Sequence, residues 1–155
     1  AREQDLPLDE AKEYIASYYG RYPKIREWKR TLLAQGTANG FVETLFGRVR
    51  NVADLRSRSP IARRAAERVA INTPVQGSAA DIIKAAMVSV DARLARELPS
   101  AKMVLQVHDE LVFEVPAADA DALVALAVEE MSGVIALSVP LVVNAAKGHT
   151  WLEAH

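Results

Sequence analysis

Several protein classes are excluded by what the chain lacks. None of its 155 residues is a cysteine, so neither a disulfide framework nor a zinc site with thiolate ligands is possible. Histidine occurs only at positions 108, 149 and 155, which argues against a metal site built mainly from imidazole ligands. No apolar run approaches the length of a membrane span, and the first residues lack the apolar core of a signal peptide. We therefore expect a cytoplasmic protein with no membrane partner.

Net charge is also nearly absent. The formal net charge is -1 and the pI is about 6.4, and this balance by itself indicates no polyanionic partner. The chain is 50% hydrophobic, and a chain of this length can bury enough apolar surface for one domain with a proper core. Because the sequence does not begin with methionine, we expect a piece of a longer polypeptide.

The balanced total hides an uneven distribution of charge. Residues 43–68 contain seven arginines against three acidic residues, whereas residues 103–146 contain seven acidic residues and no lysine or arginine. Arginine is well suited to bidentate phosphate contacts, although a solvated arginine-rich helix face is a common alternative. The arginine tract, as we call the first set, comprises Arg48, Arg50, Arg56, Arg58, Arg63, Arg64 and Arg68.

Helical periodicity and chain breakers predict a helical first half. One helix is expected to begin after Pro7 and to end at Gly20, and a second to stop near Gly36, with their aromatic residues used for packing. Residues 41–45 are expected to be extended. Ser59 followed by proline predicts the capped start of a further helix that runs to about residue 71.

The second half predicts a mixture of helices and strands. Pro74 should end or kink the preceding helix at residues 72–73, and Ser78 with Asp81 has the spacing of a capping box. A long helix then carries four apolar residues on one face, and a later helix is expected over residues 119–131. Residues 139–143 predict a final strand at a sheet edge. The apolar face of the long helix consists of Ile83, Met87, Val90 and Leu94.

Residues 104–115 predict a β-hairpin with an acidic tip. Two apolar arms, 104–107 and 111–115, flank His108, Asp109 and Glu110 without any glycine or proline between them. Tight hairpin turns need positive φ, which histidine and aspartate tolerate at some cost. Two carboxylates on a rigid apolar hairpin suggest a metal-holding device, while a solvated acidic turn is the plainer alternative. The expected fold class is α+β: this antiparallel hairpin plus the final strand, covered by long helices, after a helical N-terminal half.

Four segments carry a resemblance to a known family. Residues 106–114 (QVHDELVFE), 41–48 (FVETLFGR) and 65–84 (AAERVAINTPVQGSAADIIK) resemble, in the same order, motifs of bacterial DNA polymerase I-type enzymes, the A family. Residues 151–155 (WLEAH) resemble the C-terminus of these enzymes. The resemblance covers essentially the whole chain and rests on separate motifs, which makes it specific.

The resemblance implies roles for six residues. Asp109 would bind the catalytic magnesium ions, Glu110 would support them, and His108 would lie near the primer terminus. The side chains of Arg68, Asn72 and Gln76 would contact the minor groove of primer-template DNA, where amides and guanidinium groups can sense base-pair shape without reading sequence. Without the family, Asn72 could equally be a helix C-cap and Gln76 a locally satisfied loop amide.

The resemblance also implies an incomplete polymerase domain. The family's first metal-binding aspartate and its nucleotide-binding fingers helix have no counterpart in this sequence. Residues 1–4 look like the segment that follows the fingers helix in the family. Residues 144–148 stand where the family usually has a glycine-rich run. We expect residues 1–60 to be mainly fingers-side and 61–155 mainly palm. The implied function is template-directed DNA synthesis from deoxynucleoside triphosphates, with two Mg²⁺ ions and the remainder of the polymerase as partner. The piece alone would be inactive. A non-catalytic DNA-binding module or a vestigial polymerase fragment is the alternative.

Overall fold

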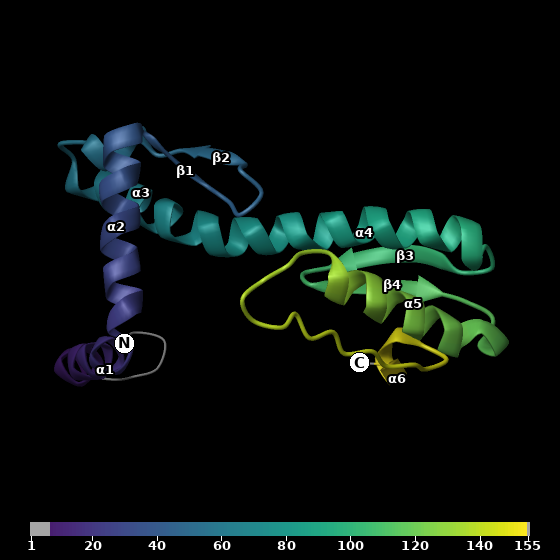
Figure 1. Ribbon diagram of the computed structural model, residues 1–155. Coiled ribbons are helices and arrows are strands. Elements are labelled where there is room, and N and C mark those ends of the chain that lie inside the picture. Colours follow the sequence, from purple (N-terminus) through teal and green to yellow (C-terminus); the bar gives the residue numbers. More distant parts are fainter. Residues whose placement is uncertain (1–6, 155) are drawn as a thin grey trace. The chain divides into compact units, whose positions relative to one another are not determined.

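The α+β class predicted from the sequence is confirmed. The computed structural model describes residues 7–154, and these form helices and two small antiparallel hairpins (Figure 1). The chain divides between Val75 and Gln76 into two compact units, each considered by itself below. The resemblance noted for residues 1–4, and the last residue of the C-terminal motif, lie outside the described residues. Within residues 7–154 no helix is both long and apolar enough to cross a membrane.

The first unit is built from helices and one short hairpin. Two long N-terminal helices are present, as the sequence predicts. Pro7 lies before the first and Pro23 in the first turn of the second, positions that suit proline. Strand β2, which pairs with β1 in antiparallel register, was not predicted. The elements are α1 (Leu8–Arg21), α2 (Pro23–Asn39), β1 (Phe41–Glu43), β2 (Val49–Asn51), a 3-10 helix (Ala53–Arg56) and α3 (Pro60–Asn72).

The predicted end of α2 near Gly36 is wrong. The helix continues to Asn39 and is closed by Gly40, whose φ of 82° places it in the left-handed region where glycine is favoured. Gly36 is buried instead: a Cβ at this position would lie 3.0 Å from Leu55 Cδ1 and 3.1 Å from Val42 Cγ1. The glycine therefore allows close packing of α2 rather than stopping it.

The core of the first unit lies where α2, α3 and the 3-10 helix meet. Helix α3 begins as predicted, with the Ser59 hydroxyl accepting a hydrogen bond from the Ala62 amide. Its buried face is lined by small residues, which lets neighbouring elements approach closely. The core residues are Val42, Val52, Leu55, Ala66 and Ala70.

The predicted end of the helix before Pro74 is confirmed. Helix α3 ends at Asn72, and the next five residues, Thr73–Gly77, form a π-helical turn before α4 begins at Ser78. A π turn accommodates the missing proline donor that would disrupt a regular helix. Ser78, which was predicted as the N-cap, is instead the first residue of α4, because the preceding residue, Gly77, is itself in a helical conformation and takes the N-cap position.

The second unit places a hairpin against two helices. Helix α4 is long and carries the predicted apolar face, and α5 ends at Gly133 as expected. Met103 and Phe113, which pair across the hairpin, pack on a core supplied mainly by the two helices. The core consists of Val90, Leu94, Ala101, Leu123 and Leu126. The elements are α4 (Ser78–Glu97), β3 (Lys102–Val107), β4 (Glu110–Glu114), a 3-10 helix (Ala117–Asp119), α5 (Ala120–Gly133) and α6 (Trp151–Ala154).

The predicted final strand is not formed. Residues 139–143 have no regular structure, and the sheet of this unit consists of β3 and β4 within the described residues. Pro140 cannot donate to a ladder, and a strand also needs a partner edge, which the segment does not find. Val139 and Val142 are exposed. A salt bridge from Lys147 to Asp121 connects the segment that follows to α5.

Candidate metal and nucleic-acid site

The hairpin turn has a defined and unusual geometry. Val107 pairs with Glu110, so the loop consists of His108 and Asp109. His108 has a φ of 53° and is the one non-glycine residue with positive φ among the described residues. Positive φ at the first central position alone is the pattern of a type II′ turn, where glycine is the usual residue. The positive φ expected from the sequence is therefore found at His108 and not at Asp109.

A side chain reinforces this turn. The amide Nε2 of Gln106 donates a hydrogen bond to the His108 carbonyl oxygen at 2.5 Å. Non-glycine residues in the left-handed region cost about 1–3 kcal/mol each and persist where the surroundings determine them. The hairpin arms and the Gln106 amide supply those surroundings.

Asp109 and Glu110 are consecutive exposed carboxylates at the tip of the hairpin. Their oxygens are the hard ligands that Mg²⁺ prefers, and this ion is commonly held by one or two carboxylates together with water and substrate phosphates. The donor chemistry therefore fits magnesium. Within residues 7–154, however, no three His, Asp or Glu side chains lie close enough together to hold a metal ion, so the pair forms only part of such a site.

The predicted groove-contacting residues are solvent-exposed. Arg68 and Asn72 lie four residues apart on α3 and share one face of it, and Gln76 is exposed in the π-helical turn. The C-cap position of α3 is occupied by Thr73 and not by Asn72, which removes the capping alternative for that residue. None of the three side chains has an intramolecular hydrogen bond or ion pair within the described part of the chain.

The arginine tract is exposed at all seven positions. Arg56 has an internal role: its guanidinium donates from Nε to the Thr37 carbonyl and from Nη2 to the Ala38 carbonyl, both at 2.6 Å. These are among the last carbonyls of α2, which have no partner within the helix. Thr37 and Ala38 lie 19 and 18 positions before Arg56 in the sequence. No local sequence signal therefore distinguishes Arg56 from the other arginines of the tract.

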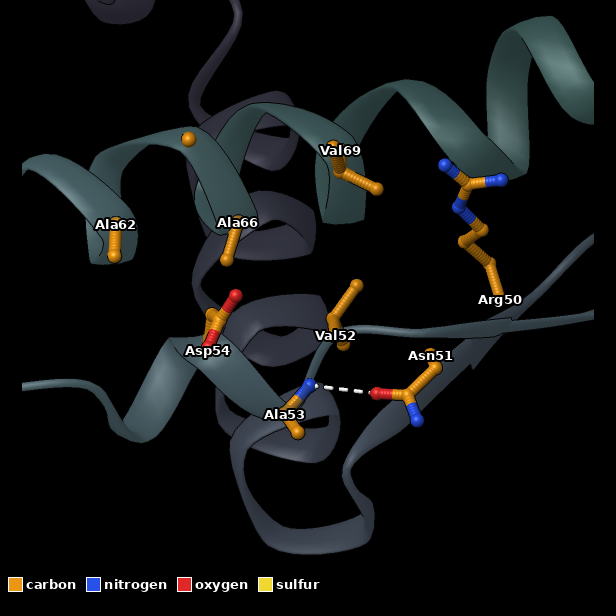
Figure 2. Close-up of a pocket in the computed structure, with 9 residues that line it drawn as sticks. Arg50, Asn51, Val52, Ala53, Asp54, Ala62, Ala66 and Val69 are labelled. Atoms are coloured by element: carbon orange, nitrogen blue, oxygen red, sulfur yellow. Dashed lines mark hydrogen bonds between the residues drawn. The ribbon is translucent and has the colours of Figure 1, made fainter.

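A pocket of about 280 Å³ lies in the first unit between α3 and the 3-10 helix that follows β2 (Figure 2). Its wall includes Arg50, Asp54 and the small face of α3. A hydrogen bond from the Ala53 amide to Asn51 Oδ1, 2.9 Å long, fixes one side. None of the six residues implied by the resemblance lines this pocket.

A charged cluster that the sequence did not reveal connects α4 and α5. Arg93 on α4 donates to Glu129 at 2.6 Å and to Glu130 at 2.9 Å on α5, and also to Glu97 on its own helix. Ser89 donates a further hydrogen bond to Glu130. The hydrogen bond from Ser89, followed by that from Arg93, lowers the pKa of the Glu130 carboxyl below its usual 4.5. This cluster holds together the two helices on which the hairpin packs.

Known proteins resemble the chain over nearly its full length. It is 49% identical over 154 residues to the thermostable DNA polymerase I of Thermus aquaticus, 51% identical over 152 residues to that of Thermus thermophilus, and 41% identical over 154 residues to DNA polymerase I of Lactococcus lactis subsp. cremoris. The matches cover 98–99% of this chain but only 18% of each relative.

A solved structure is similar throughout. The POL domain of Pol1 from M. smegmatis, in complex with DNA primer-template and dNTP, has a TM-score of 0.94 and 38% identity, covering 99% of this chain and 27% of that one. Residues 1–153 match the sequence profile described as DNA polymerase family A. Because this match spans nearly every residue and the hairpin, helices and exposed turn described above accompany it, the chain belongs to DNA polymerase family A.

Proposed function

We propose that the chain is part of an enzyme that performs template-directed DNA synthesis. Primer-template DNA and deoxynucleoside triphosphates are the proposed partners, together with the rest of a polymerase domain, since the M. smegmatis relative was solved with DNA and dNTP. Residues 1–60 would be mainly fingers-side and residues 61–155 mainly palm. The observation that carries the proposal is the exposed His108-Asp109-Glu110 turn on a core-packed hairpin in a family A chain.

In the proposed reaction the primer 3′-hydroxyl attacks the α-phosphate of the incoming nucleotide. A bond forms between the 3′ oxygen and the α-phosphorus, the bond from the α-phosphorus to the bridging oxygen breaks, and pyrophosphate leaves in line with the electron pair. The hydroxyl proton passes to solvent water. Asp109 and Glu110 would hold Mg²⁺, which stabilises charge on the attacking and leaving oxygens when bound. An aspartate outside this chain would complete the two-metal site. His108 would lie beside the primer terminus.

The proposed role of Arg68, Asn72 and Gln76 is to sense the shape of newly formed base pairs. Their donors are exposed and have no intramolecular partner among residues 7–154. Every base pair presents acceptors in the minor groove at similar positions, so such donors can distinguish a well-formed pair from a distorted one. The exposed arginines of the tract other than Arg56 and Arg68 would contact phosphates.

A second candidate function applies to the chain by itself. With no group of three metal-ligating side chains in the described residues, but several exposed arginines, residues 1–155 alone would bind duplex DNA weakly and would not extend a primer. Binding should weaken as salt rises, because phosphate contacts release counterions.

The test is primer extension with magnesium and nucleotides, performed on residues 1–155 and on the full-length polypeptide that contains them. Extension by the full-length polypeptide alone supports the polymerase proposal. Extension by neither, with salt-sensitive binding by both, supports a DNA-binding module. Extension by residues 1–155 alone would mean that a complete site exists within this chain.

A further inference from the structure

The turn between β1 and β2 exposes two large apolar side chains. Leu45 and Phe46 form the centre of this turn and are 65% and 46% exposed, although turns usually carry glycine, proline or small polar residues. We call these two residues the apolar turn. Val49, at the start of β2, is exposed as well. Exposed apolar side chains that gather in one place indicate a binding surface more strongly than single ones do.

Hydrogen bonds hold the apolar turn in a fixed conformation. The Gly47 amide donates to the Thr44 carbonyl at 3.0 Å, and the Thr44 amide donates to the Arg48 carbonyl at 3.1 Å. Thr44 is buried, and its hydroxyl accepts a hydrogen bond from the Arg48 amide at 3.1 Å. Gly47, with a φ of 77°, supplies the left-handed residue that closes a three-residue hairpin loop. The two apolar side chains therefore stand on a stiff support, which reduces the entropy that is lost on binding.

The charge around the apolar turn fits a polyanionic partner. Within residues 41–51, two exposed arginines, Arg48 and Arg50, stand against one acidic residue, Glu43. Among the described residues no aromatic ring or guanidinium stacks on the ring of Phe46. An aromatic face beside arginines is the combination that binds single-stranded nucleic acid, because bases stack on the ring and phosphates pair with the cations. The interior bases of a duplex are stacked on one another and offer the ring no free face.

We propose that the apolar turn binds unpaired bases of the template strand, with the Phe46 ring stacked on one base and Arg50 in contact with a phosphate of the same strand. This inference rests on the proposed function, because a template-directed polymerase acts on DNA that has an unpaired template segment. None of the six residues implied by the resemblance has this role, which is to contact template that has not yet been copied.

Four substitutions in the full-length polymerase test the proposal. Phe46→Leu keeps an apolar side chain without a flat ring, and Phe46→Tyr keeps the ring. Phe41→Leu, at the other end of the hairpin where Phe41 pairs with Asn51, is the matched control. Arg50→Gln removes one cation. The measurements are Tm and the Kd for a single-stranded oligonucleotide, for a primer-template with an unpaired template overhang, and for the same duplex without the overhang, each Kd at several salt concentrations.

Loss of the ring should weaken binding to unpaired DNA. Phe46→Leu should raise the Kd for the single strand and for the overhang substrate by about fivefold to a hundredfold, the range expected for one lost base–aromatic stack. Its affinity for the blunt duplex, its slope of log K against log salt and its Tm should stay close to those of the control. Phe46→Tyr should bind as wild type. Arg50→Gln should reduce the salt slope by about 0.7, as expected for one phosphate contact on a single strand.

Unchanged affinities of Phe46→Leu for the single strand and the overhang substrate would overturn the proposal. An equal loss on the blunt duplex would also overturn it, because the contact would then be with paired DNA. A lower Tm with unchanged affinities would mean that another part of the polymerase covers the turn, and would overturn it too.

Primer extension by the wild type separates these results from failure of the proposed function. If the wild type extends primers and Phe46→Leu binds DNA as the control does, only the role of the apolar turn is wrong. If the wild type neither binds nor extends primers, the proposed function itself is wrong.

Discussion

Arg93 on α4 and Glu130 on α5 lie 2.9 Å apart, and Ser89 donates to the same carboxylate. The hydrogen bond from Ser89 and that from Arg93 lower the pKa of Glu130. A carboxyl whose pKa is lower in the folded state than in the unfolded state contributes stability above its unfolded value of 4.5, and this stability is lost as the pH falls below that value.

Ser89→Ala should therefore lower the Tm at neutral pH and reduce the loss of Tm on acidification. The measurement is thermal unfolding at several pH values from neutral to about 3, around the usual carboxyl range. Ser138→Ala, at an exposed serine of the same unit, is the control. Parallel curves for wild type and Ser89→Ala would mean that the bond to Glu130 does not contribute in solution.

Gly36→Ala should destabilise the chain although alanine is the better helix former. Its Cβ would lie 3.0 Å from Leu55 Cδ1 in a packed core, and overpacking of about 1–3 kcal/mol outweighs a propensity gain of about 1 kcal/mol. Gly20→Ala, in α1 with nothing within 4 Å of the new Cβ, should leave stability unchanged or raise it. Equal effects of the two substitutions in chemical denaturation would contradict the close packing of α2.

Substitution of Arg56 should affect the stability of the chain, whereas substitution of Arg63 should affect its binding to DNA. Arg56→Ala removes two hydrogen bonds to the end of α2 and should lower the free energy of unfolding by about 1–2 kcal/mol, while the salt dependence of DNA binding stays the same. Arg63→Ala should leave stability unchanged and reduce the slope of log K against log salt by about 0.9 for one lost phosphate contact. The opposite assignment of the two effects would show that Arg56 contacts DNA.

Truncation of Arg68, Asn72 or Gln76 to alanine should impair extension of mismatched primer termini more than that of matched termini. Each well-made groove contact is worth roughly 1–3 kcal/mol. Single-turnover extension from matched and mismatched primers gives the ratio directly. Wild-type discrimination in all three variants would exclude groove sensing by these residues.

Features set by neighbouring residues were predicted from the sequence, and features set by distant partners were not. The Ser59 cap, the apolar face of α4 and the hairpin arms depend on local spacing, and the structure contains all three. Strand β2 and the missing strand at residues 139–143 depend on whether a partner edge is available. Local spacing also misread Gly36, whose role comes from Leu55 across the core.

The candidate site divides in the same way. The acidic turn, with positive φ at His108, follows from the sequence between two apolar arms. The hydrogen bond from Gln106 to the His108 carbonyl and that from Arg56 to the Thr37 carbonyl depend on the conformation of each side chain in the folded structure. Residue type alone does not predict these contacts. The metal and DNA roles of the site residues rest on family membership and stay predictions.

Primer extension by the full-length polymerase carrying Asp109→Ala tests the central claim most directly. We expect the rate to fall by at least about a hundredfold, equivalent to about 2.7 kcal/mol, with unchanged primer-template affinity, because the proposed role of the carboxylate is to hold metal and not DNA. Glu110→Ala should reduce the rate less, and Asp91→Ala, at an exposed aspartate of α4, should not reduce it. An Asp109→Ala rate within about tenfold of wild type, a difference of only about 1.4 kcal/mol, would contradict the assignment of this turn as the metal-holding part of a polymerase site.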